Sequence, residues 1–68
     1  MKWEIGHYYK LDHCKHYYKV LKLNEFGDAS VYSYWTDHNY LWSRSLRGQV
    51  VEVTDPAKIK ELKLRRIR

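Results

Sequence analysis

Aromatic side chains are what most constrain the fold of this 68-residue chain, which contains seven Tyr, three Trp and one Phe. A chain of this length has room for one domain, and it buries only about 60% of the surface that its unfolded form exposes. Domains this small usually need disulfides, a metal or oligomerisation, and the single cysteine, Cys14, excludes an internal disulfide. Each buried aromatic removes roughly 150–250 Å² from water, so these rings can supply a dense core instead.

Short runs of strand-forming residues, separated by turn residues, occupy most of the chain before residue 55. The runs are 7–11, 16–24, 29–36, 40–45 and 49–54. In the second run the apolar alternation shifts phase between Val20 and Leu21, as expected where a long strand bends. Gly27 can adopt the positive φ that a tight hairpin requires. Five short strands at this spacing predict a mainly β fold, a small five-stranded antiparallel barrel.

The chain changes character at residue 56. Asp55 can cap a helix and Pro56 suits its first position, while Ile59 and Leu62 would share a face that docks on the barrel. Residues 1–55 carry seven basic and seven acidic residues, whereas residues 56–68 carry six basic and one acidic residue, so the whole net charge of +5 lies there. We expect residues 1–55 to form the barrel and residues 56–68 a basic C-terminal helix or tail of the same domain, with 63–68 either helical or extended.

The order of these features resembles a Tudor-type domain of the Src-homology-three-like barrel class, over residues 3–51. The resemblance lies in Trp3-Glu4-Ile5-Gly6-His7, Tyr17-Tyr18-Lys19-Val20, the run from Gly27 to Trp35, Asn39 and Leu46-Arg47-Gly48. Tudor domains surround a methylated Lys or Arg with an aromatic cage that acts by cation–π attraction. Position by position, the resemblance places Tyr18 and Tyr34 in the cage and Asn39 beside it. Leu11 and Asp37 stand where two further cage aromatics would be, so the implied cage is incomplete.

Exposed aromatics next to cations form the predicted binding surface. If Val31 faces the core together with Trp35, alternation directs Tyr32 and Tyr34 outward, and Trp42 would share a strand face with Arg44. Such aromatics stack nucleic-acid bases, and tail cations contact phosphates. An ordinary barrel core and a solvated helix face are the alternative interpretations of these residues. The predicted binding residues are Tyr32, Tyr34, Trp42, Arg44, Lys63, Arg65, Arg66 and Arg68.

Signals for catalysis or a cofactor are missing from the sequence. There is no Gly-rich phosphate loop, serine elbow or paired-carboxylate arrangement that stands out. Cys14 and His16 would share a face of an extended segment and could hold zinc together with one more histidine, from His7, His13 and His38, but they form only half of the usual pattern of two ligand pairs. We therefore expect no enzyme activity, no cofactor and no metal.

The sequence predicts a small non-catalytic binding module, with nucleic acid as the leading partner. The alternatives are a protein-interaction module, such as a small regulator or inhibitor of a larger protein, and a homo-oligomer formed through strand edges. The lone cysteine and the lack of an apolar leader favour a cytoplasmic location. No run approaches 18 consecutive apolar residues, so no membrane span is expected.

Overall fold

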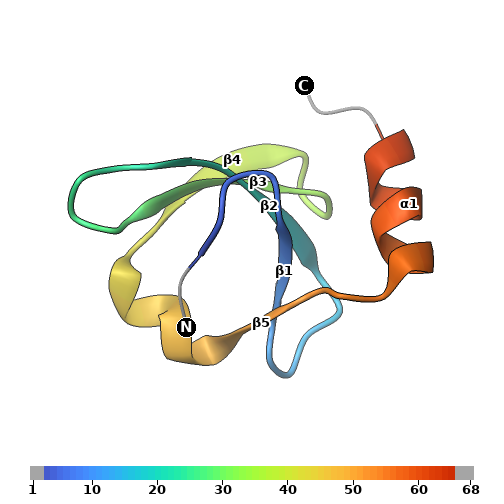
Figure 1. The fold of residues 1–68 in the computed structure, drawn as a ribbon, viewed down its shortest axis with the longest axis horizontal. Helices are drawn as coiled ribbons and strands as arrows, with labels where there is room; N and C mark the ends of the chain where they lie inside the picture. Colours follow the sequence, from blue (N-terminus) through green and yellow to red (C-terminus); the bar gives the residue numbers. More distant parts are fainter. Residues whose placement is uncertain (1–2, 66–68) are drawn as a thin grey trace.

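The computed structural model describes residues 3–65, which form five β-strands, a 3-10 helix and one α-helix (Figure 1). The strands are β1 (Tyr8–Leu11), β2 (Tyr17–Leu23), β3 (Ala29–Ser33), β4 (His38–Trp42) and β5 (Val50–Glu52). The 3-10 helix η1 (Arg44–Gln49) lies between β4 and β5, and the α-helix α1 (Pro56–Leu64) follows β5. The predicted mainly β class with a short C-terminal helix is confirmed.

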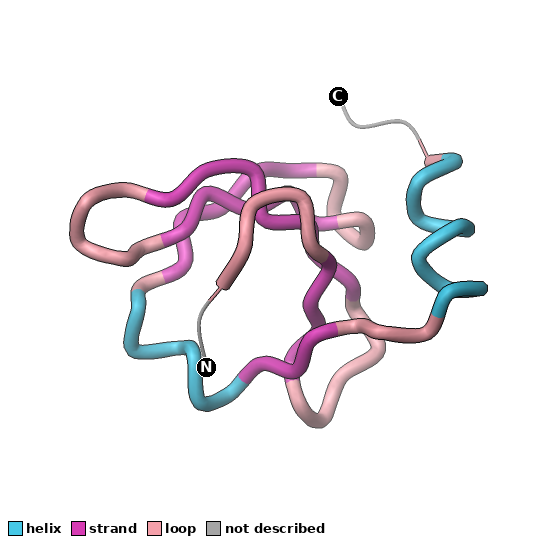
Figure 2. The backbone as a smooth tube through the Cα atoms, in the orientation of Figure 1, coloured by secondary structure: helices cyan, strands magenta, loops and turns pink. Residues whose placement is uncertain are grey.

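All strand pairs are antiparallel, and the strands of the single sheet lie in the order β4-β3-β2-β1-β5. Strands β1 to β4 form a meander, and η1 then carries the chain to the opposite edge, where β5 pairs with β1 (Figure 2). Within residues 3–65 no ladder joins the edge strands β4 and β5, and η1 forms the connection between them. The five-stranded antiparallel sheet is confirmed, and closure into a barrel is not.

Strand β2 contains a bulge at the point where its apolar residues shift phase. Its register with β3 shifts between Val20 and Lys22, which marks a bulge at Leu21. Before the bulge, Tyr18 and Val20 face one side of the sheet; after it, Leu23 takes up that side again. Leu21 itself packs on the opposite side. The predicted phase shift is confirmed, and its cause is the extra residue that a bulge inserts into one strand.

The turn between β2 and β3 forms where the sequence predicts it. Gly27 has a φ of 86°, in the left-handed region that glycine enters without steric cost. The side-chain oxygen Oδ1 of Asn24 accepts hydrogen bonds from the backbone N–H groups of Phe26 and Asp28, both at 2.9 Å. Such Asx contacts replace the backbone bonds that the turn lacks, so this hairpin is specified locally.

The sheet separates two hydrophobic clusters. The cluster that we call the Trp cluster consists of Trp3, Tyr9, Val20, Ala29, Val31, Trp42 and Val50. The cluster that we call the Tyr cluster consists of Tyr8, Tyr32, Tyr34, Val53 and Leu62. Neighbouring residues along β1 and β3 belong to different clusters, because successive side chains of a strand point to opposite faces. The chain thus buries both faces of its sheet.

Helix α1 covers the Tyr cluster and stands on the other side of the sheet from η1 (Figure 1). It begins as predicted: the side chain of Asp55 accepts a hydrogen bond from the N–H of Ala57 at 3.1 Å, and Pro56 follows the cap. Ile59 and Leu62 pack on the tyrosines, which confirms the docking face expected from their spacing. No helix among residues 3–65 combines the length and apolar character needed to cross a membrane.

Candidate functional site

The prediction that Tyr32, Tyr34 and Trp42 are exposed is wrong. Their exposed fractions are 3%, 4% and 6%. Trp42 lies in the Trp cluster with its ring centroid 5.6 Å from that of Trp3, and the two tyrosine rings meet edge to face at 5.0 Å in the Tyr cluster. For Tyr32 and Tyr34 the physical reason is that α1 covers the second face of the sheet, so alternation along β3 directs side chains into two clusters instead of one cluster and solvent. Trp42 is buried on the other face, against Trp3 and Tyr18.

The aromatic that is exposed near β3 is Trp35, which the alternation assigned to the core. Strand β3 ends two residues earlier, at Ser33. The Ser33 hydroxyl accepts hydrogen bonds from the N–H groups of Trp35 and Thr36, at 3.3 and 3.2 Å, and its carbonyl accepts from the N–H of Asp37 at 3.0 Å. This turn ends the strand, and with it the alternation of side chains between the two faces of the sheet. Trp35 therefore lies outside the sheet and is 66% exposed.

Trp35 stacks on His16, the residue just before β2. The two ring centroids are 3.9 Å apart, and the ring planes are within 4° of parallel. The pair borders a shallow hollow of about 240 Å³. We call this hollow the stacking site; its lining residues are Lys15, His16, Tyr17, Tyr34, Trp35 and Arg65. Two of the six are cationic and none is acidic, so the site offers aromatic surface and positive charge together.

Arg65 connects α1 to the stacking site. Its Nη2 donates a hydrogen bond to the carbonyl oxygen of Tyr34 at 2.9 Å, and its Cζ lies 5.4 Å from the centre of the Tyr34 ring. The hydrogen bond uses one of the five N–H donors of the guanidinium group. Burial, followed by the neighbouring Tyr8 and Tyr32, raises the pKa of Tyr34 far above 10.0 although Arg65 lowers it. The Tyr34 hydroxyl is therefore neutral over the physiological pH range.

The other predicted basic residues lie apart from this site or outside the described part of the chain. Arg44 begins η1 beside the β2–β3 hairpin, where its backbone N–H donates to the Asp28 carboxylate at 2.8 Å. It shares no strand face with Trp42, because β4 ends at Trp42. Lys63 is exposed and borders another cavity. Arg66 and Arg68 lie outside the described residues.

The positions that the Tudor resemblance assigns to a cage do not face one another. Tyr18 packs with the Trp cluster, its ring centroid 4.7 Å from that of Trp42, whereas Tyr34 belongs to the Tyr cluster. The register explains the separation: Tyr18 lies opposite Ser33 on β3, so the next residue, Tyr34, projects from the other face. Asn39 is exposed on the edge strand β4. The sheet separates the two tyrosines, so they form no common cage.

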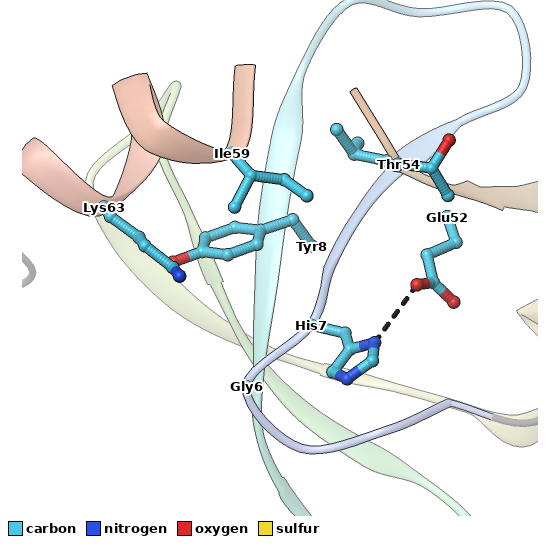
Figure 3. A pocket seen from close by; sticks show the side chains of 8 residues that line it. Gly6, His7, Tyr8, Glu52, Thr54, Ile59 and Lys63 are labelled. Carbon is cyan, nitrogen blue, oxygen red and sulfur yellow. Dashed lines mark hydrogen bonds and ion pairs between the residues drawn. The ribbon is translucent and has the colours of Figure 1, made fainter. Parts of the chain in front are cut away.

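A second cavity, of about 350 Å³, lies between β1, β5 and α1 (Figure 3). Ile59 and Lys63 lie beside Tyr8 on its helix side, and His7 and Glu52 lie on the other side (Figure 3). The His7 Nδ1 is 3.1 Å from the Glu52 carboxylate and 3.3 Å from that of Glu4. This cavity therefore carries both an acidic and a basic side, unlike the stacking site.

Potential metal ligands gather in one place among residues 3–65, at Glu4, His7 and Glu52, whose ligand atoms lie within 4.8 Å of one another. One nitrogen and two carboxylate oxygens would suit a divalent ion. In this structure, however, the three groups contact one another, with His7 Nδ1 next to both carboxylates. The cluster of Cys14 and His16 that the sequence suggested gathers no third ligand in the described part of the chain.

The residues that the sequence interpretation missed are Trp35 and Lys15, together with the stacking role of His16. The signal that could have found them is the spacing of Ser33 and Asp37. A serine hydroxyl can close a turn on the next two residues, and Asp37 adopts a φ of 57°, a region that Asp enters more readily than most residues. Because the strand ends at Ser33, the alternation of faces does not extend to Trp35 and does not predict that it is buried.

Comparisons of the chain with protein-family models, with curated proteins and with solved structures find no significant match. The function has therefore to be argued from the stacking site itself.

Proposed function

We propose that this protein is a non-catalytic module that binds nucleic acid at the stacking site. The observation that carries the proposal is the exposed Trp35 ring, stacked on the half-buried His16 in a hollow that Lys15 and Arg65 also line. A base stacked on an aromatic side chain contributes about 1–3 kcal/mol. Cations beside the base add phosphate contacts that depend on salt but not on sequence.

The position of the basic C-terminal segment supports the same partner. Arg65 lines the stacking site, and Arg66 and Arg68 follow it within three residues of sequence. Three residues reach at most about 10 Å, which is the scale of a neighbouring nucleotide. Part of the chain's excess charge, Arg65, thus lies at the hollow that the exposed Trp35 lines, and the rest is close to it in the sequence.

Binding of fluorescein-labelled oligonucleotides, followed by anisotropy at several salt concentrations, tests the proposal. We expect affinity to fall as salt rises, and the variant with Lys15, Arg66 and Arg68 changed to Ala to bind more weakly. The slope of log affinity against log salt should decrease by about 0.7 for each phosphate of a single strand that the variant no longer neutralises. Arg65 is left unchanged in this variant because it also holds α1 against Tyr34.

The matched control replaces Lys22, an exposed lysine of β2 that does not line the stacking site, with Ala. Its salt slope should equal that of the unchanged protein. Equal affinities for the triple variant and the unchanged protein at low salt would contradict the proposed role of these cations, and no binding of any oligonucleotide would contradict the function.

The proposal extends to the fold class. A four-stranded meander whose fifth strand returns to pair with β1, together with a bulged and bent β2, supports an Src-homology-three-like architecture. Binding residues are disproportionately found on loops that a rigid scaffold positions, and the turn after Ser33 carries Trp35. Hydrogen exchange that shows no protection of the β1–β5 backbone hydrogen bonds would contradict this assignment.

A second candidate function is protein interaction at the edge strand β4. Tyr40 and Leu41 are exposed there, and they border a hollow of about 360 Å³ together with Leu21 of β2. An open strand edge with exposed apolar side chains can accept a strand of another chain. A partner that is captured after nuclease treatment, and is no longer captured when Leu41 is changed to Lys, would favour this function over the first. A larger species in a sizing experiment would indicate pairing of two copies instead.

A further inference from the structure

We infer that the stacking site accepts an unpaired base, so that the ligand is single-stranded nucleic acid and not a duplex. The inference rests on the proposed function and adds the strandedness of the ligand. The basis of the inference is the accessible surface of the stacked Trp35 and His16 rings and of α1.

One face of the Trp35 ring is already covered. His16 lies on it in parallel at 3.9 Å, so the pair resembles two successive bases of a stack and can grow only at a free face. A base can join that stack only if its own face is exposed. Inside a duplex, the neighbouring base pairs cover both faces and leave only the base edges accessible in the grooves. The ring pair therefore selects bases that are not in a helix.

The rest of the protein offers little to a duplex groove. Reading the major groove requires an α-helix or a two-stranded ribbon that can enter it. The one α-helix among residues 3–65 is docked through Ile59 and Leu62. Its Lys58 lies 4.9 Å from the centre of the Tyr17 ring, and Arg65, the residue that follows the helix, contacts Tyr34. Trp35 stands on a short turn, which suits contact with a flexible strand.

The size of the hollow agrees with a single ring as ligand. Its volume of about 240 Å³ is below the range of about 300–1,000 Å³ typical of pockets that enclose a small molecule. With Lys15 and Arg65 among its lining residues, a strand that places one base on Trp35 brings its phosphates near both cations. Recognition of this kind tolerates any base, because every base has a π-face.

Intrinsic tryptophan fluorescence reports directly on the site. Trp3 and Trp42 are buried, and Trp35 is the exposed member of the three. We expect oligo(dT) or oligo(U) to quench Trp35 emission and to protect it from acrylamide, and we expect the duplex of oligo(dT) with oligo(dA) of the same length to do neither. Anisotropy measured in parallel gives the affinity for each ligand.

The deciding variant is Trp35→Ala, checked for folding by circular dichroism, with Trp35→Phe as the conservative second variant. We expect Trp35→Ala to weaken single-strand binding by about 5- to 150-fold while duplex binding stays unchanged, and Trp35→Phe to retain most of the affinity. The matched control is Phe26→Ala, because Phe26 is as exposed as Trp35 but lies in the hairpin at the other end of β3. Its affinity should equal that of the unchanged protein.

The outcomes separate this inference from the proposed function. If single strands and duplexes bind equally and Trp35→Ala has no effect, while the cation variant still weakens binding, the inference is wrong and nucleic-acid binding stands. If no oligonucleotide binds at low salt, both are wrong. Preferential binding of single strands that depends on Trp35 but not on Phe26 supports both.

Discussion

The Trp cluster and the Tyr cluster lie on opposite faces of one sheet, yet they are closed in different ways. Residues of β1 to β5 and the segment around Trp3 contribute to the Trp cluster. The Tyr cluster lies under a single nine-residue helix, α1, which contributes Leu62 and the half-buried Ile59. An isolated helix of this length is marginal in water, so packing on the tyrosines is what stabilises it.

The two clusters also differ in polar groups. Tyr34 and Tyr32 each bring a hydroxyl group that needs a partner, and the Tyr32 hydroxyl donates to the Asp37 carboxylate. The Trp cluster contains aliphatic side chains, two indoles and the hydroxyl of Tyr9, which accepts a hydrogen bond from the N–H of Glu4 at 2.9 Å. The comparison indicates one core that holds the sheet together and a second that holds the helix and the stacking site in place.

The largest effect should come from Trp42→Ala in the Trp cluster. The ring is buried against Trp3 and Tyr18, and loss of a buried aromatic of this kind costs about 3–5 kcal/mol. Because a small domain is stable by only about 5–15 kcal/mol, we expect a largely unfolded or severely destabilised chain. Urea denaturation measures the effect, and Leu41→Ala, at the exposed neighbour on β4, should stay within about 0.5 kcal/mol. A destabilisation below about 1 kcal/mol for Trp42→Ala would show that the Trp cluster is not the main core.

A smaller and more local effect is expected from Leu62→Ala in the Tyr cluster. Leu-to-Ala changes in a core cost about 2–5 kcal/mol, and we expect about 2 kcal/mol because the helix can detach from an intact sheet. Hydrogen exchange should then show reduced protection in α1 and retained protection in β1 to β3. Leu64→Ala is the control, since Leu64 is exposed on the same helix. An equal reduction of protection in the helix and the sheet would contradict two separable cores.

Alkaline pH should act on the tyrosines of both clusters. Burial raises the pKa of Tyr34 and of Tyr9 above 10.0, so between that pH and the folded-state pKa the native state holds more protons than the unfolded state. The contribution of these two tyrosines to stability is therefore constant below about pH 10 and falls above it, by up to about 1.4 kcal/mol per pH unit for each group. Denaturation midpoints measured from pH 8 to 11 should fall less steeply in Tyr34→Phe than in the unchanged protein. A slope that responds to Tyr9→Phe but not to Tyr34→Phe would assign the effect to the Trp cluster alone.

The smallest effect should be that of Trp3→Phe. Within residues 3–65 the Trp3 Nε1 is the one buried side-chain polar atom without a hydrogen-bond partner. In the unchanged protein, a buried donor without a partner costs about 1–3 kcal/mol of stability, and the phenylalanine variant removes this cost. The gain offsets most of the packing energy that is lost with the smaller ring. We expect a net change within about 1 kcal/mol by urea denaturation. Trp42→Phe, which removes no such donor, should cost more, and the reverse order would indicate that the Trp3 indole has a partner in solution.

Local patterns predicted the elements with short-range causes. The Gly27 hairpin, the phase shift at the β2 bulge and the Asp55 cap depend on residues within one turn of each other, and all three are found. For the candidate site, the sequence predicted the types of side chain but not the residues that supply them. Aromatic rings lie beside cations, but they are those of Trp35 and His16 and not those of Tyr32 and Tyr34. The error had two causes: α1 covers Tyr32 and Tyr34, and side-chain hydrogen bonds at Ser33 end the strand before Trp35.

The sequence by itself determined that this chain forms five short antiparallel strands followed by a capped basic helix, because propensity, alternation and capping act between near neighbours. The tertiary structure alone decided which aromatic rings reach solvent. A period of two assigns side chains to two faces of a sheet but does not say what covers each face. Docking of α1 through Leu62 buried the face that carries Tyr32 and Tyr34, and the turn after Ser33 left Trp35 outside both cores.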